Sequence, residues 1–305
     1  MIETTSVGNP PLEPVLIHEY LPTAGKRPAK GKRLTPAPVF AITSGKGGVG
    51  KTNIAANLAA ALARKKKRVM VMDADLGLAN LDLLLGVKPS CTLADFFTGA
   101  ATLDEILVCN RDGVVLLPGA SGVQEITSLR RDQKIALLTG LDAMTHEMDM
   151  VLVDTGSGIS DAVTYFTSAA QEIVVVVTPE PSSMTDAYAL VKVLTSNHRQ
   201  KRFWILANSV SGEEDARRVF DTLSRTALRF LNASLDLLGW IPKDSRLVRA
   251  VARSQMVVVD APDSPSAQSF VAIAERLIQM STAGVKVKGN VQFFFRRMIE
   301  GRRRT

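Results

Sequence analysis

Cysteine, histidine and aromatic residues are all scarce in this 305-residue chain, which contains two Cys, three His and 5% aromatic residues. Cys91 and Cys109 lack the spacing of a zinc site or of a disulfide framework, so a reducing cytosol is the expected compartment. No apolar run is long enough to cross a bilayer. Residues 1–21 contain acids and no continuous apolar core, which excludes a signal peptide.

Positive charge is plentiful, with a formal net charge of +7, but it is concentrated at the two ends. Residues 1–38 carry five basic and three acidic groups, residues 284–305 carry seven and one, and residues 39–283 carry 25 and 26. A nearly neutral body argues against a broad nucleic-acid surface, so no sequence-specific nucleic acid is expected as a partner. The basic C-terminal end is suited instead to an anionic surface.

Apolar runs alternate with amphipathic stretches from residue 39 onward, after a leader over residues 1–38 that is rich in Pro, Gly and Lys. The expected strands are 39–43, 68–73, 114–117, 150–154, 172–178, 203–207 and 235–240. The expected helices are 53–65, 131–147, 160–169, 183–196, 213–230 and 266–280. Because uniformly apolar strands alternate with helices, the sequence predicts an α/β fold. It should be a doubly wound, mostly parallel sheet with helices on both faces.

A glycine-rich segment joins the first expected strand to the first expected helix, which is the context of a phosphate-binding P-loop. The segment consists of Gly45, Lys46, Gly47, Gly48, Val49, Gly50, Lys51 and Thr52. Its backbone N–H groups can surround phosphate oxygens at a helix N-terminus, where negative charge is favoured. Lys51 is expected to reach the β- and γ-phosphates and the Thr52 hydroxyl to hold Mg²⁺. The early Lys46 is not required by a plain P-loop.

Polar residues follow three other expected strands, at the sheet edge where ligands bind in this fold. Asp154 is expected to support Mg²⁺, and Gly156 lets the backbone approach a γ-phosphate. Asp73 and Asp75 should point to one side of a strand end, one near the metal and one near the attacking water. Their alternative role is to cap a turn or the next helix.

Asn208 follows the strand at 203–207 and can pair with a purine edge, although an asparagine there can also simply form a turn. The residues after it, Ser209 and Val210, do not continue the guanine-reading pattern N-K-x-D. ATP is therefore the expected nucleotide, with Mg²⁺ as its metal.

The segment from Gly45 to Thr52 resembles the deviant Walker A motif of the MinD/ParA ATPases, which belong to the SIMIBI class of P-loop proteins. Residues 73–82 resemble their first switch segment and residues 154–158 their second. Within that family the chain most resembles the FlhG group (FleN or YlxH), which regulates flagellar number. The residues that carry this further resemblance are 51–53, 73–80, 159–161, 169–172, 185–190 and 206–208.

The resemblance implies an ATPase whose two protomers meet face to face around the nucleotide. Lys46 would then cross to the partner's phosphates in trans, as an arginine finger does. Lys51 would act beside it, and Asp75 would position the hydrolytic water. ATP hydrolysis to ADP and phosphate is expected to be slow and stimulated by a partner.

The same resemblance assigns further roles around the nucleotide. Asp73 and Asp154 would support Mg²⁺, and Asn80 and Asp82 would lie on the surface that responds to ATP. Flagellar assembly proteins are the implied partners, namely the FlhF GTPase and components of the C-ring. Residues 1–38 lack the D-Q-A-x-x-L-R motif through which FlhG proteins stimulate FlhF, so activation of FlhF is not predicted.

The C-terminal segment fits a short, basic amphipathic helix with one apolar face. That face consists of Val291, Phe294, Phe295 and Met298, and Arg296 and Arg297 flank it. MinD and FlhG proteins end in a membrane-targeting helix of this kind, which implies peripheral attachment to the cytoplasmic face of the inner membrane when ATP is bound. The alternative is that these phenylalanines dock on the protein's own body or on a partner.

The sequence therefore predicts a flexible leader (1–38), a MinD/ParA-type ATPase domain (39–280), a linker (281–289) and a membrane-targeting helix (290–305). The expected function is an ATP-dependent dimerising switch that regulates flagellar number or placement. A MinD-type division-site ATPase is the alternative. A ParA-type DNA-partition ATPase is disfavoured by the neutral body, and an iron–sulfur carrier by the absence of a C-x-x-C pair.

Overall fold

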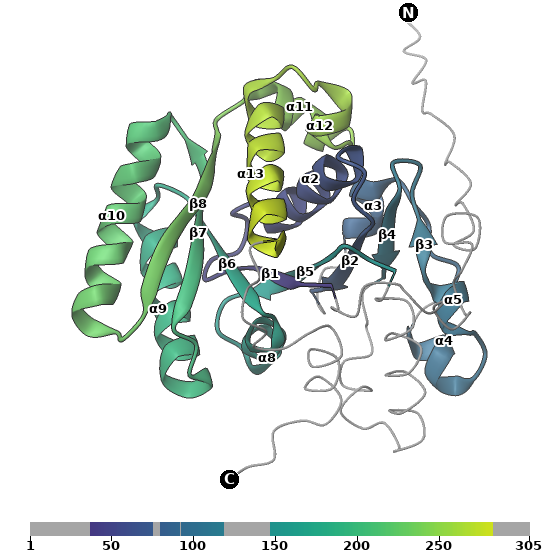
Figure 1. The fold of residues 1–305 in the computed structure, drawn as a ribbon, viewed down its shortest axis with the longest axis horizontal. Coiled ribbons are helices and arrows are strands. Elements are labelled where there is room, and N and C mark those ends of the chain that lie inside the picture. The colour runs from purple at the N-terminus through teal and green to yellow at the C-terminus, as the bar shows by residue number, and fades with distance from the viewer. Residues whose placement is uncertain (1–36, 76–79, 92, 119–146, 283–305) are drawn as a thin grey trace, which may run out of the picture.

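The computed structural model describes residues 37–75, 80–91, 93–118 and 147–282, which form one sheet and the helices around it (Figure 1). The sheet has eight strands in the order β3-β4-β2-β5-β1-β6-β7-β8. All pairings are parallel except that of β3 with β4. The strands are β1 (Val39–Ser44), β2 (Val69–Ala74), β3 (Val108–Cys109), β4 (Val114–Leu117), β5 (Met150–Ser157), β6 (Glu172–Val177), β7 (Arg202–Val210) and β8 (Ser234–Pro242).

The predicted α/β class and mostly parallel sheet are confirmed, and all seven expected strands are present. The sequence missed β3, because a two-residue strand is too short to show any periodicity. β5 and β7 also extend farther than expected, to Ser157 and Val210. Both extensions lie at the carboxyl ends of the strands, where polar residues hide the strand pattern.

The described helices are α2 (Lys51–Arg64), α3 (Leu81–Leu85), α4 (Leu93–Thr98), α5 (Leu103–Ile106), α8 (Asp161–Ala169), α9 (Pro181–His198), α10 (Glu213–Phe230), α11 (Ser245–Ala252), α12 (Val257–Asp260) and α13 (Pro265–Thr282). Five of the six expected helices are confirmed. The sixth, 131–147, falls almost wholly outside the described residues. α13 continues to Thr282, so the first two residues of the expected linker belong to this helix.

Both faces of the sheet are covered, and the two cores use alternate residues of each strand. Phe40 and Ile42 of β1 pack in a cluster with α2, α12 and α13. Val39 and Ala41 of the same strand face the other way and pack with residues of α8. On this second face α9 and α10 cover β6 and β7. Burial on both faces explains why the strands read as continuous apolar runs rather than as alternating ones.

The strand order brings three functional segments to one edge of the sheet. β5 lies between β2 and β1, so the carboxyl ends of these three strands are neighbours. In this register Asp73 on β2 stands directly beside Asp154 on β5, and Ile42 on β1 stands on the other side of Asp154. Ligands of doubly wound sheets bind at this edge, so the fold positions the glycine-rich loop and two strand-end carboxylates at one place.

Among the described residues, no helix is both long enough and apolar enough to span a membrane. The predicted amphipathic helix at 290–305 lies outside the described residues, as do most of the predicted leader and of the predicted linker.

Candidate nucleotide site

The glycine-rich loop after β1 turns through left-handed backbone just before α2 begins. Gly48 has a φ of 75°, and Gly50, the N-cap residue of α2, has a φ of 90°. Residues with a Cβ rarely adopt this conformation, which glycine accepts readily. The loop is tied down by hydrogen bonds at its start, where the Ser44 hydroxyl donates to the Lys46 carbonyl at 2.7 Å. Gly158 N–H donates to the Ser44 carbonyl at 2.9 Å.

Gly45 is required by a close approach of helix α9 rather than by its own backbone angles. A Cβ added to Gly45 would lie 2.0 Å from the carbonyl oxygen of Asp186, which is backbone and cannot move aside. α9 therefore packs directly on the start of the loop. Only glycine at position 45 leaves room for α9 to lie there.

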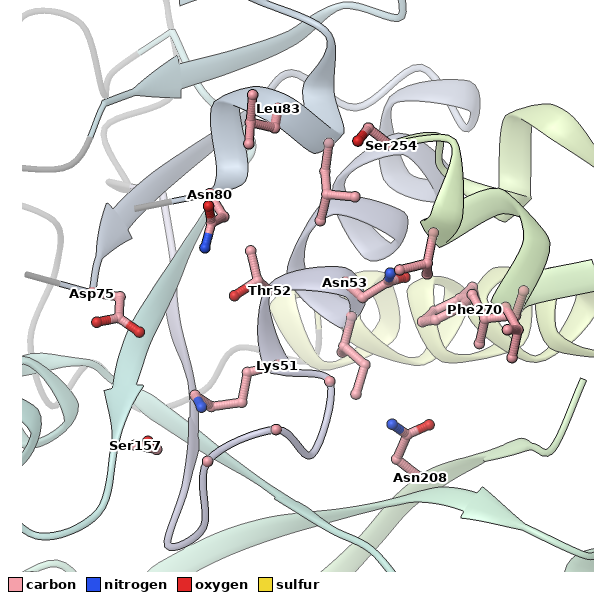
Figure 2. Close-up of a pocket in the computed structure, with 18 residues that line it drawn as sticks. Lys51, Thr52, Asn53, Asp75, Asn80, Leu83, Ser157, Asn208, Ser254 and Phe270 are labelled. Carbon is pink, nitrogen blue, oxygen red and sulfur yellow. The ribbon is translucent and has the colours of Figure 1, made fainter. Parts of the chain in front are cut away.

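A cavity of about 640 Å³ opens above the loop and the N-terminus of α2 (Figure 2). The predicted residues that line it are Gly47, Gly48, Gly50, Lys51, Thr52, Asp75, Asn80 and Asn208. The fold thus joins residues that lie more than 150 positions apart in the sequence. Of the predicted set, Gly45, Lys46, Val49, Asp73, Asp82, Asp154 and Gly156 do not line the cavity wall itself.

Lys51 and Asp154 form the buried, charged floor of the site. Lys51 is 7% exposed and Asp154 is fully buried. Burial lowers the pKa of Lys51, while the charges of Asp154 and Asp75 act in the opposite direction. Burial likewise raises the pKa of Asp154 to about 7, offset in part by the Thr52 hydroxyl and by Lys51. Among the described residues neither carboxylate oxygen of Asp154 has a hydrogen-bond partner that meets normal geometry.

Asp154 is therefore an unsatisfied buried acceptor next to a buried cation. A buried carboxylate without hydrogen bonds is costly and normally has a ligand or a counterion to accept from. A Mg²⁺ ion with its water shell, held by Thr52 and a nucleotide phosphate, fits this donor set, because Mg²⁺ prefers oxygen ligands and retains several waters. The residues present thus fit the expected cofactor.

Asp73 has both of its oxygens engaged with backbone, and this supports the capping role that the sequence left open. Its Oδ1 accepts from Asp75 N–H at 3.1 Å and its Oδ2 from Leu81 N–H at 3.4 Å. It is 2% exposed, and burial raises its pKa to about 6. Asp73 therefore joins the two flanks of the segment between β2 and α3. Its support of Mg²⁺ stays a prediction.

Asp75 and Gly156 lie against each other, and the predicted role of Asp75 toward the attacking water stays a prediction. A Cβ added to Gly156 would be 3.5 Å from the nearer carboxylate oxygen of Asp75 and 3.3 Å from Val163. Any larger residue at position 156 would crowd Asp75. Figure 2 shows Asp75 and Lys51 on the same side of the cavity, with Asn80 above them.

Lys46 points away from the cavity and is held by the start of α9. Its Nζ lies 2.5 Å from Glu180 Oε2, and it donates to Ser182 Oγ at 2.9 Å. The side chains of Lys46 and Glu180 are 34% and 63% exposed, so solvent screens this ion pair and its contribution to stability is small. In this chain conformation Lys46 is bound to its own protomer, and the predicted contact in trans stays a prediction.

Asn208 anchors the loop as well as lining the cavity. Its amide donates to the Val49 carbonyl at 2.7 Å, and its Oδ1 accepts from Ser209 N–H at 2.9 Å. The second bond lies within β7, at a shift in its register with β8, where Ser209 has a φ of 59°. Asn208 therefore lies inside the strand rather than in a turn after it, so the turn-forming alternative weighed from the sequence is wrong, and a purine contact stays a prediction. Asp82 lies at the start of α3, where it accepts from Leu83 N–H at 2.9 Å.

Several residues of the site were missed by sequence reasoning. The missed cavity-lining residues are Asn53, Ile54, Leu83, Leu84, Ser157, Leu247, Val248, Val251, Ser254 and Phe270. One signal was available in α11, whose apolar residues Leu247, Val248 and Val251 share a face although only Ala250 of this helix is buried. Val248 is 67% exposed and Val251 43% exposed. An eight-residue helix with an uncovered apolar face indicates a ligand or partner surface.

The fold and the geometry of the loop define a P-loop nucleotide-binding protein. A family model, described as ParA, NUBPL iron-transfer P-loop NTPase, matches residues 36–278. The chain is 40% identical to the antiactivator FleN of Pseudomonas aeruginosa over 265 residues, which is 87% of this chain and 94% of FleN. It is 36% identical to the flagellum site-determining protein YlxH of Helicobacter pylori, over 86% of this chain and 89% of YlxH.

The structure is also similar to the septum site-determining protein MinD of Pyrococcus horikoshii, which was solved in complex with Mg-ADP. The TM-score is 0.62 at 27% sequence identity, over 83% of this chain and 100% of that one. The chain belongs to the ParA/MinD family of P-loop NTPases. The family resemblance read from the sequence is thereby confirmed.

The raised pKa of Asp154 predicts a pH-dependent cost to the ligand-free fold. The ordinary pKa is 3.8 and burial raises it to about 7, so the folded chain retains a proton that the unfolded chain has released. Protonated Asp154 contributes stability that is fully present below about pH 4 and is lost as the pH rises toward 7. Asp154→Asn stays neutral, so relative to wild type it should gain free energy of unfolding between pH 5 and pH 7.5.

Urea denaturation of the nucleotide-free protein at both pH values measures this difference. Asp236→Asn is the control for removing one carboxylate, because Asp236 lies near the start of β8 and pairs with Arg202 far from the loop. A difference between Asp154→Asn and wild type that stays constant from pH 5 to pH 7.5 would contradict the assignment.

Proposed function

We propose that this protein is an ATP-dependent dimerising switch that associates with the cytoplasmic face of the inner membrane and regulates the number or placement of flagella. The observation that carries the nucleotide part is the burial of two opposite charges, Lys51 and Asp154, at the glycine loop, with both Asp154 oxygens unsatisfied. The flagellar part is supported by 40% identity to FleN along nearly the whole of that protein.

In this proposal each polar residue of the site has one task. Lys51 and the loop N–H groups bind the β- and γ-phosphates, and the helix dipole of α2 favours their charge. Thr52 and Asp154 hold Mg²⁺, which when bound neutralises charge on the phosphates. Asp75 orients the attacking water beside Gly156. Asn208, whose amide donates to the Val49 carbonyl, holds the loop and contacts the purine base of the nucleotide.

Slow turnover and stimulation by a partner belong to the same proposal. Lys46 is supported as a residue that acts on a second copy because it lies beside the loop yet does not line the cavity of its own protomer. A contact with a second protomer would have to exchange the bonds to Glu180 and Ser182 for bonds to a phosphate. Hydrolysis would then depend on assembly, and partners such as FlhF or the C-ring would act on the assembled form.

Substitution of Lys46 should separate nucleotide binding from dimerisation. Lys46→Ala is expected to keep most nucleotide affinity but to stay monomeric with a non-hydrolysable ATP analogue, as measured by light scattering. Lys65→Ala is the matched control, since Lys65 is equally exposed (33% against 34%) and pairs with Glu275 on α13, away from the loop. Dimerisation of Lys46→Ala at the wild-type concentration would contradict a role in trans.

Membrane attachment should depend on the apolar face at 291–298 and on the nucleotide. The wild type is expected to sediment with vesicles containing anionic lipid only when the ATP analogue is present, because a dimer presents two short basic helices. Phe294→Ser/Phe295→Ser should abolish sedimentation. Phe293→Ser is the control because Phe293 lies off the predicted apolar face. Equal loss in the control, or binding without nucleotide, would contradict the proposal.

A MinD-type role in division-site selection is the second candidate, supported by the likeness to the MinD structure. Deleting the gene separates the two candidates, because a flagellar regulator should change the number of flagella per cell without producing minicells. Complementation with Lys51→Ala should fail to restore the flagellar number, since a chain that cannot bind nucleotide cannot switch. Minicells together with normal flagellar counts would favour the division role.

A further inference from the structure

A buried asparagine on α2 connects Asn53, which lines the cavity, to helix α12. Asn57 lies in the second turn of α2 and is fully buried. Its Nδ2 donates to the Asn53 carbonyl at 2.8 Å and to Asn53 Oδ1 at 2.7 Å. Its Oδ1 accepts from the backbone N–H of Val258 at 3.1 Å. Both ends of this amide are therefore in use.

These hydrogen bonds fix the orientation of the Asn57 side-chain amide and, through it, that of the Asn53 side-chain amide. A backbone N–H can only donate, so the bond from Val258 forces the Asn57 oxygen toward α12 and the Asn57 nitrogen toward Asn53. The nitrogen of Asn57 in turn requires the oxygen of Asn53. The Nδ2 group of Asn53 is then the end of the amide pair left for the cavity, which Asn53 lines. With the described residues this group makes no hydrogen bond.

The far end of this chain of bonds is α12, and the helix before it, α11, forms part of the cavity wall. Val258 is the second residue of α12, whose N-terminus receives no side-chain cap from its own N-cap residue. α12 follows α11 directly, and Val248, Val251 and Ser254 of this α11–α12 unit line the cavity. Asn57 thus satisfies a buried N–H that would otherwise lack a partner at a helix start.

Apolar residues of the α11–α12 unit, Ala250, Val257 and Val258, pack in the core with α2 and α13, and its other polar contacts lie at its two ends. Asp244 accepts from Ser266 Oγ at 2.6 Å at one end, and Arg253 pairs with Asp260 at 2.6 Å at the other. Asn57 supplies a buried polar link between this unit and the helix that begins at the phosphate loop. A buried hydrogen bond in a low-dielectric interior constrains position more strongly than an exposed ion pair does.

We infer that Asn53 and Asn57 form a positioning relay, in which Asn53 donates to an oxygen of the bound nucleotide and Asn57 couples that contact to the placement of α11–α12. The inference rests on the proposed nucleotide site, because it needs an oxygen-bearing ligand in the cavity. Binding of the nucleotide in the cavity would in this way act on the apolar face of α11. The nucleotide would then order the wall of its own cavity through α2.

The test compares Asn57→Ala, Asn53→Ala and the double variant with wild type, in the full-length protein. Affinity is measured with a fluorescent ATP analogue, and hydrogen exchange is followed over residues 245–260 with and without that analogue. Gln171→Ala is the matched control, because the Gln171 side-chain amide likewise accepts a backbone N–H, from Val39 at 2.9 Å, but at the opposite edge of the sheet.

Either single variant should bind the analogue about 3- to 10-fold more weakly, as expected for the loss of one hydrogen bond in the site. Each should also lose nucleotide-induced protection of residues 245–260. The double variant should be no weaker than the worse single variant, since a relay acts as one unit. Asn53→Ala should keep the protection of Val258 in the absence of nucleotide, whereas Asn57→Ala should lose it. Gln171→Ala should keep the wild-type affinity and protection.

Wild-type affinity and protection in Asn53→Ala would overturn the inference, and this variant remains decisive if Asn57→Ala fails to fold, because Asn53 is only half-buried. A fall in melting temperature in Asn57→Ala as large as in Gln171→Ala, with unchanged affinity, would likewise reduce Asn57 to a structural role. A wild-type chain that bound no nucleotide would overturn the proposed function and the inference together.

Discussion

Asp154 stands at the centre of the sheet edge, with β2 on one side and β1 on the other, and no described group satisfies its two oxygens. Leaving a carboxylate in this state disfavours its charged form, and its pKa rises to about 7 for that reason. The neighbouring Lys51 is also buried, and its positive charge offsets only part of the cost of burying the Asp154 carboxylate. The charges of the site suit a metal–phosphate group, which carries charge of both signs. The glycine-rich loop, the surrounding helices and the second strand-end carboxylate, Asp73, all lie around the place where such a group would bind.

Three helical elements meet at the loop and its cavity, namely α2, α9 and the α11–α12 unit, and each is held by a different interaction. α2 begins at Gly50 and supplies its N-terminal N–H groups. α9 reaches the loop because Gly45 has no side chain, and its first turn binds Lys46 through Glu180 and Ser182. The α11–α12 unit reaches the same cavity from the other face of the sheet and is linked to α2 by Asn57. A change at the phosphates can therefore act on both faces of the molecule with small movements of the loop.

Much of the fold was predictable because its signals are local. Each central strand is buried on both faces and so reads as an uninterrupted apolar run, and the loop from Gly45 to Thr52 carries its glycines where left-handed backbone needs them. The roles of Asp73 and Asn208 were left open because each depends on which backbone group lies nearby, and spacing does not reveal this. Asn57 and Glu180 were missed for a related reason. Their partners, Val258 and Lys46, lie 201 and 134 positions away, and neither residue type marks the contact.

The two lysines of the loop differ in what surrounds them, and that difference separates binding from switching. Lys51 is buried beside Asp154, and in the proposed function it binds the phosphates of its own cavity. Lys46 is one-third exposed and is bound by two exposed groups of α9, so releasing it exchanges weak, screened contacts. A phosphate presented by a second copy is a stronger partner for an ammonium group than an exposed glutamate is, because a nucleotide concentrates several charges at one point. In the proposed switch, Lys46 would exchange its exposed partners as protomers meet, while the buried Lys51 would keep the nucleotide in place.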